Sequence, residues 1–119
     1  MKIYRSTLIV AAGLISLEAA ANCEMPSLVG NIPDGATATE DELLATQAEV
    51  ETYVEAMDRY IACSNAEIDS SDQDASADFL YWMSARVESA RAEADAVARK
   101  FNDEVNAFRA ARQAPAIRR

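Results

Sequence analysis

Two long segments of the chain carry residues at the spacing of an α-helix that packs along another helix. In the first, residues 39 to about 67, the positions recur at alternating steps of four and three: Leu43, Gln47, Val50, Val54, Met57 and Ile61. In the second, residues 76 to about 113, the same steps give Leu80, Met83, Val87, Ala90, Ala94, Val97, Phe101, Val105 and Phe108. Each set makes one stripe along a helix, suited to packing against a second helix.

Local signals mark the ends of both predicted helices. Thr39 followed by Glu42 is the pattern of a capping box at a helix N-terminus. Serine and aspartate residues between 68 and 75 interrupt the first stripe and predict a loop. Ser76 or Asp74 can cap the second helix, and Pro115 prevents it from continuing. Because the loop is short, the sequence predicts an all-α fold, an antiparallel two-helix hairpin with coiled-coil-like packing.

Residues 22–38, before the first helix, show neither a helical nor a strand period. They contain Pro26, Gly30, Pro33 and Gly35, and the stretch NIPDG is typical of a turn. We therefore expect an extended N-terminal arm in front of the hairpin, which spans residues 39–119.

Residues 1–21 have the organisation of a secretory signal peptide. Lys2 and Arg5 precede an apolar run of 12 residues, and small residues end the segment at Ala21, where we expect cleavage. The apolar run is too short for an ordinary membrane-spanning helix. The alternative is an uncleaved anchor, in which Glu18 would lie unfavourably in lipid.

The cysteine that follows this segment opens a second alternative, because exported bacterial lipoproteins carry lipid on such a residue. That chemistry favours a small residue immediately before the cysteine, whereas Asn22 precedes Cys23 here. We therefore expect an exported protein, periplasmic or secreted to the cell surface, with no stable membrane insertion after the leader is removed.

The charge of the chain excludes two classes of partner. The net charge is −9 at neutral pH, and removing Lys2, Arg5 and Glu18 with the leader makes it −10. Nucleic acids and anionic membrane surfaces repel such a chain. A protein partner, in particular one with a basic surface, is compatible with it.

Cys23 and Cys63 are the two cysteines of the chain. In a small exported protein an even pair is most simply a disulfide. The 16 residues between Cys23 and Thr39 reach about 53 Å when extended. Cys63 lies about 36 Å along the first helix from Thr39, so the arm is long enough to bring the cysteines together. A free or intermolecular Cys23 remains the alternative.

Four short motifs make the chain similar to a group of other proteins. They are C-x-x-P from Cys23, IPDG from Ile32, Y-x-x-C from Tyr60 and FN-x-x-V-x-AF from Phe101. In these motifs the chain resembles an uncharacterised family of small exported bacterial helical-hairpin proteins. The resemblance covers most of the chain after the leader. It implies paired cysteines and export, and it implies no activity.

Candidate chemistry is sparse. The chain has no histidine, which excludes histidine-based nucleophile arrangements, and it has no glycine-rich phosphate loop. The oxygen-bearing residues of the predicted loop have spacings similar to those of a calcium loop: Asp69, Asp72, Asp74, Ser76 and Asp78. However, Ala77 and Met83 stand where such a loop requires glycine and glutamate. We therefore expect no enzymatic activity, no cofactor and no metal site.

Two apolar surfaces exceed what a two-helix hairpin can bury. One is the aromatic start of the second helix, with Phe79, Tyr81 and Trp82. The other is the far end of that helix, with Phe101, Val105 and Phe108. Either surface is a candidate partner contact, because exposed aromatic residues favour interfaces. The alternative is that the arm covers them, with residues 28–33 placed over the second.

Together these features predict a non-catalytic exported interaction module. We expect an accessory subunit of a bacterial envelope or surface assembly that binds another protein, and a second copy of the chain is a further candidate partner. The alternative function is a free periplasmic or secreted binder, inhibitor or chaperone-like protein. Recognition of a basic target by such a free acidic protein would weaken steeply with added salt.

Overall fold

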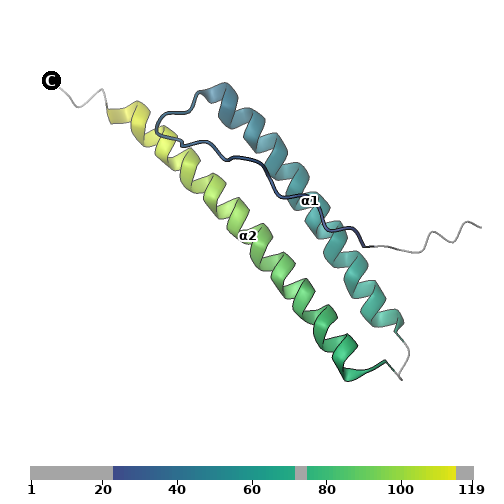
Figure 1. Cartoon of the computed structure of the whole chain (residues 1–119). Helices are drawn as coiled ribbons and strands as arrows, with labels where there is room; N and C mark the ends of the chain where they lie inside the picture. The colour runs from purple at the N-terminus through teal and green to yellow at the C-terminus, as the bar shows by residue number, and fades with distance from the viewer. Residues whose placement is uncertain (1–22, 72–74, 115–119) are drawn as a thin grey trace, which may run out of the picture.

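The computed structural model describes residues 23–71 and 75–114. The predicted leader, and the residues 72–74 within the predicted loop, lie outside this part of the chain. Helix α1 (Glu40–Ser70) and helix α2 (Ala77–Gln113) lie side by side and antiparallel, and residues 23–39 form an arm that leads into α1 (Figure 1). The predicted all-α hairpin is therefore confirmed. Neither helix is long and apolar enough to cross a membrane over the described residues.

Helix α1 begins at a complete capping box. The Thr39 hydroxyl accepts the Glu42 backbone N–H at 3.2 Å, and the Glu42 carboxylate accepts the Thr39 backbone N–H at 2.8 Å. The helix continues to Ser70, past residue 67 where the sequence places its end, because serine and aspartate lower helix propensity without forbidding a helix. At Ser71 the backbone turns extended, and the Ser71 hydroxyl donates to the Ile68 carbonyl at 2.6 Å.

Helix α2 is capped by Ser76, one of the two residues that the sequence offers for this role. The Ser76 hydroxyl oxygen accepts the Phe79 backbone N–H at 3.1 Å. Asp78 in the first turn and Arg112 in the last turn both complement the helix dipole. The helix ends at Gln113, shortly before Pro115, which cannot continue it.

The interior contains two clusters of buried side chains along the helix seam, and Met83 and Val87 of α2 are buried as well. The first contains Tyr53, Met57, Tyr60 and Ala90. The second contains Leu43, Val50 and Phe101. Residues of the arm pack against both: Cys23 and Val29 against the first, and Val29, Ile32 and Ala38 against the second. The arm is therefore a third layer of the core.

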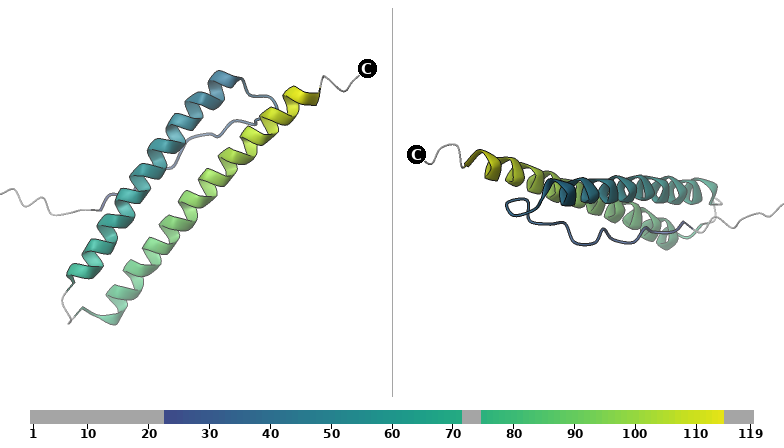
Figure 2. Two further views of the ribbon diagram at one scale, coloured as in Figure 1. Left: turned by 180° about the vertical axis from the view of Figure 1, so that it is seen from behind. Right: turned by 90° about the horizontal axis from the view of Figure 1, so that it is seen from above.

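The arm lies on one face of the hairpin, which we call the arm face (Figure 2). The opposite face, which we call the open face, carries Val54, Ile61, Ala94 and Ala98. The position of the arm explains why α1 buries a wider stripe than its period predicts. Thr46, Tyr53, Tyr60 and Ser64 are buried, whereas Gln47 is exposed and Val54 and Ile61 are half-buried. The buried stripe is thus displaced toward the arm face.

Candidate functional site

Four consecutive large apolar residues are exposed at the start of α2, and we call them the aromatic cluster. Their exposed fractions are 41% for Phe79, 38% for Leu80, 68% for Tyr81 and 66% for Trp82. The rings of Tyr81 and Trp82 meet edge to face with centroids 5.6 Å apart. This ring geometry is favourable and holds the two side chains together at the surface. The sequence proposes Phe79, Tyr81 and Trp82 as contact candidates and places Leu80 on the helix-packing stripe, and the exposure of Leu80 shows that the packed part of the stripe begins at Met83 instead.

The helix geometry explains why this cluster stays exposed. Consecutive residues point about 100° apart, so four in a row cover every side of a helix. The next residue, Met83, is buried, and it shares a hollow with Cys23, Tyr60 and Ser64. The described arm begins at Cys23 beside that hollow and then runs away from the start of α2 (Figure 1). The expectation that the arm covers the aromatic residues is therefore not met by the described residues.

The second group of contact candidates has a different environment. Phe101 is 9% exposed, and Val105 and Phe108 are partly buried against the same cluster. Ile32 and Ala38 of the arm pack there as well. The structure therefore buries Phe101 and partly buries Val105 and Phe108 in a cluster that the arm helps to cover, and Val105 also lines a hollow on the open face. It does not bring them together with the aromatic cluster.

The disulfide between Cys23 and Cys63 holds the start of the arm on α1. The two Cα atoms lie 5.6 Å apart, and the residues are separated by 40 positions. The predicted pairing is confirmed. The Glu67 carboxylate lies within 4.8 Å of both sulfur atoms. Because metal ions bind cysteine as thiolate, the oxidised pair does not offer this group as a metal site.

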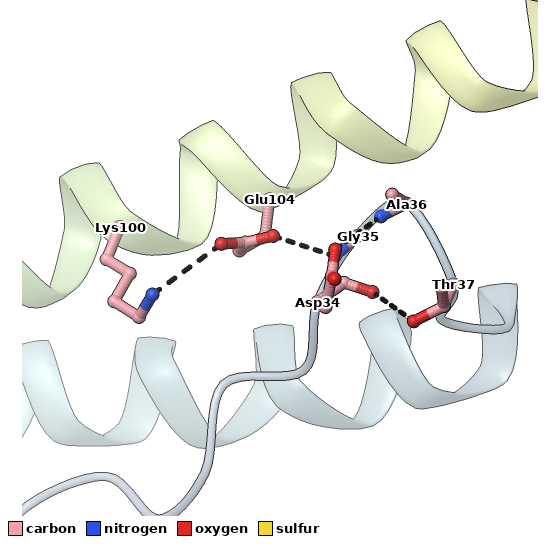
Figure 3. Close-up of polar contacts among 6 residues, drawn as sticks. All are labelled: Asp34, Gly35, Ala36, Thr37, Lys100 and Glu104. Carbon is pink, nitrogen blue, oxygen red and sulfur yellow. Dashed lines mark hydrogen bonds and ion pairs between the residues drawn. The ribbon is translucent and has the colours of Figure 1, made fainter.

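The other end of the arm is clasped to α2 at Gly35. The Gly35 backbone N–H donates to the Glu104 carboxylate at 2.7 Å, and the second oxygen of that carboxylate lies 3.5 Å from the Lys100 ammonium (Figure 3). The side chain of Asp34 accepts the Ala36 N–H at 2.9 Å and stabilises the turn. A Cβ atom at Gly35 would overlap the backbone carbonyl of Glu104. Position 35 therefore requires glycine, because there is no room for a side chain between the turn and α2.

An apolar shelf lies where the arm crosses the outer side of α1. Pro26, Leu28 and Val29 of the arm and Ala48 of α1 line a hollow of about 490 Å³ there. Leu28 is 68% exposed, and Met25, three residues earlier on the arm and outside this hollow, is 50% exposed. Both residues are separate from the aromatic cluster and are suited to matched control substitutions.

Tyr53 is the buried polar residue that the sequence gives no reason to single out. Its side chain is 4% exposed, and its hydroxyl has no hydrogen-bond partner among the described residues. Burial raises the pKa of Tyr53, and the negative charge of Glu93 raises this pKa further. The hydroxyl therefore carries a desolvation cost without a hydrogen bond to offset it.

We expect Tyr53→Phe to leave the free energy of unfolding unchanged or to raise it by up to about 1 kcal/mol, because it removes an unpaired buried hydroxyl. Since the folded chain holds the pKa of Tyr53 above the ordinary value near 10, tyrosinate favours the unfolded chain. The contribution of protonated Tyr53 to the free energy of unfolding is fully present below about pH 10. It is lost as the pH rises through the folded-state pKa of Tyr53.

Urea unfolding at neutral pH and at a series of values above pH 10 measures both effects. The stability of the unsubstituted chain should fall more steeply with alkaline pH than that of Tyr53→Phe. Tyr60→Phe makes the same deletion at the other buried tyrosine of the cluster and serves as the control. A loss of more than about 1 kcal/mol in Tyr53→Phe at neutral pH would show that the hydroxyl is bonded.

Comparison with known proteins does not assign a family or a function to this chain. Neither a family model, nor a curated protein, nor a solved structure matches the chain. The function is therefore argued from the surfaces of the hairpin themselves.

Proposed function

We propose that this protein is a non-catalytic interaction module of the bacterial envelope or cell surface, and that the aromatic cluster is where a protein partner docks. The observation that carries the proposal is the exposure of Phe79, Leu80, Tyr81 and Trp82 together at one end of the hairpin. Tyrosine and tryptophan dominate the binding energy of protein interfaces, because they bury a large area and lose little rotamer freedom.

Two further features support the proposal. The disulfide is typical of an oxidising compartment, which favours export and agrees with the predicted leader. The arm joins the two helices, because the disulfide ties its start to α1 and the Gly35 N–H binds Glu104 of α2, and the cluster lies at the other end of α2.

Replacing Tyr81 and Trp82 together by alanine tests the proposal. A stoichiometric partner should copurify with the unsubstituted protein from gently solubilised envelopes. We expect the double variant to bind this partner at least 30-fold more weakly, as loss of about 2 kcal/mol at a binding hot spot implies. Titration of the identified partner by calorimetry measures the change.

Met25→Ala combined with Leu28→Ala is the matched control, because it removes two exposed apolar side chains from the arm. Its affinity for the partner should stay within about threefold of the unsubstituted value, since it leaves the aromatic cluster intact. Circular dichroism should show the same helix content in all three proteins. Equal loss in both double variants would contradict a site at the cluster, and recovery of the protein alone in the soluble fraction would favour the free binder.

A further inference from the structure

The open face of the hairpin is a second candidate binding surface. It lies along the seam between the helices, whereas the aromatic cluster lies at the start of α2. On this face the seam between the helices forms two adjoining hollows, of about 460 Å³ and 360 Å³, and Ala98 lines both. Val54, Ile61 and Ala94 line the first hollow, and Val50 and Val105 line the second. A groove with apolar residues at its centre and polar residues at its borders therefore follows the seam, and no residue of the arm lines it. Figure 2 shows the arm on one face of the hairpin only.

Charged residues border this groove in a regular way. Acidic Glu51 and Asp58 lie on its α1 side, and basic Arg91 and Arg109 lie on its α2 side. Asp95 is the acidic exception on the α2 side. None of these five residues has an ion-pair partner within 23–71 and 75–114, where the ion pairs are Lys100–Glu104 and Arg112–Glu40.

Each hollow carries one acidic residue of α1 and one basic residue of α2. Asp58 and Arg91 line the same hollow, and Glu51 and Arg109 share the other. A two-fold axis that runs along the groove keeps each height and places α1 of one copy over α2 of the other. In that arrangement each hollow meets its own copy, so Asp58 comes to the hollow that holds the other copy's Arg91 and Asp95, and Glu51 comes to the hollow that holds the other copy's Arg109. A two-fold axis across the groove would instead set acidic α1 over acidic α1.

We infer that the open face binds a second copy of this chain, and that the dimer is a four-helix bundle with the two arms on its outer faces. Each helix then has antiparallel neighbours on two sides, which is the ordinary arrangement in such bundles. The surface is self-complementary, as a two-fold dimer requires. No residue of the aromatic cluster lines the groove, so the inference does not rest on the function proposed above.

Sedimentation equilibrium of the full chain, as recovered from an exporting host, tests the dimer. We expect a concentration-dependent monomer–dimer equilibrium for the unsubstituted protein. Ala98→Glu places a charge in both hollows, and we expect it to weaken the dimer by at least tenfold while the helical circular dichroism is retained. A monomer at all accessible concentrations would overturn the inference, as would a dimer that persists in Ala98→Glu and is lost in Trp82→Ala.

Charge reversal tests the arrangement of the two copies. Asp58→Arg and Arg91→Asp alone each set like charges against each other twice, and we expect either to weaken the dimer about tenfold at low salt. Mixing the two variants restores complementary pairs in a heterodimer, so the mixture should associate as well as the unsubstituted protein. A pairing within one chain cannot be restored by mixing.

Glu55→Arg and Arg99→Asp are the controls, because both residues are exposed and neither lines the groove. These variants carry the same charge changes, and we expect the dissociation constants of their dimers to stay within about twofold of that of the unsubstituted dimer. Dimerisation that is equally weakened in the controls would show an effect of net charge and would overturn the paired arrangement. Mixtures that do not recover would overturn it too.

Discussion

Reduction of the Cys23–Cys63 disulfide is expected to lower the free energy of unfolding by about 4 kcal/mol. The bond closes a loop of 40 residues, and the chain-entropy relation assigns about this value to such a loop. Small domains are stable by only about 5–15 kcal/mol in total, so this loss is a large part of the whole. Cys23 and Val29 pack against Tyr53 and Tyr60, and a released arm would also leave these rings covered less well.

Urea unfolding of the oxidised and reduced protein measures this effect. Cys23→Ser combined with Cys63→Ser should match the reduced protein, and it should not respond to the reductant, which controls for effects of the reagent itself. A change of less than about 1 kcal/mol on reduction would mean that the reduced arm stays in place and the unfolded chain is already compact.

Gly35→Ala is expected to destabilise the protein by about 3 kcal/mol, the second largest effect. The new methyl group would meet the backbone carbonyl of Glu104, which cannot move without disturbing α2. Overpacking of this kind costs about 1–3 kcal/mol. The displaced turn would also break the hydrogen bond from the Gly35 N–H to the Glu104 carboxylate, whose loss costs about 1.5–3 kcal/mol. The two costs overlap, since release of the turn relieves the clash.

Gly30→Ala is the matched control for this substitution. A Cβ atom at Gly30 meets nothing within 4 Å, and neither glycine has a positive φ, so the two sites differ in the space for a Cβ atom and in the hydrogen bond that Gly35 makes to Glu104. We expect Gly30→Ala to stabilise the protein by about 0.4–1 kcal/mol through the unfolded chain. Thermal unfolding of both variants provides the comparison. Similar stability changes at the two sites would contradict the close approach of the turn to α2.

The hairpin could be predicted because its signals are local or periodic. The capping box at Thr39 and the stripe through Val50 and Met57 depend on neighbours in the sequence and on the helix repeat. The pairing of Cys23 with Cys63 followed from compartment and reach, since each cysteine had one possible partner in the chain.

The details that the arm determines could not be predicted in the same way. An irregular segment has no period, so the sequence does not say which face of the hairpin it covers. The structure shows that the arm buries Tyr53 and Tyr60 and covers Phe101, whereas it leaves Trp82 exposed. The clasp between Gly35 and Glu104 joins residues 69 positions apart and depends on a single backbone N–H. Contacts of that kind leave no pattern along the chain.

The position of the disulfide gives the chain the topology of a lariat. The closed ring runs from Cys23 to Cys63 and contains the arm and most of α1, whereas all of α2 belongs to the tail. The covalent bond therefore holds the arm to the first helix and leaves the docking of α2 entirely to side-chain packing and hydrogen bonds. The tail can separate from the ring and return to it while the ring stays closed.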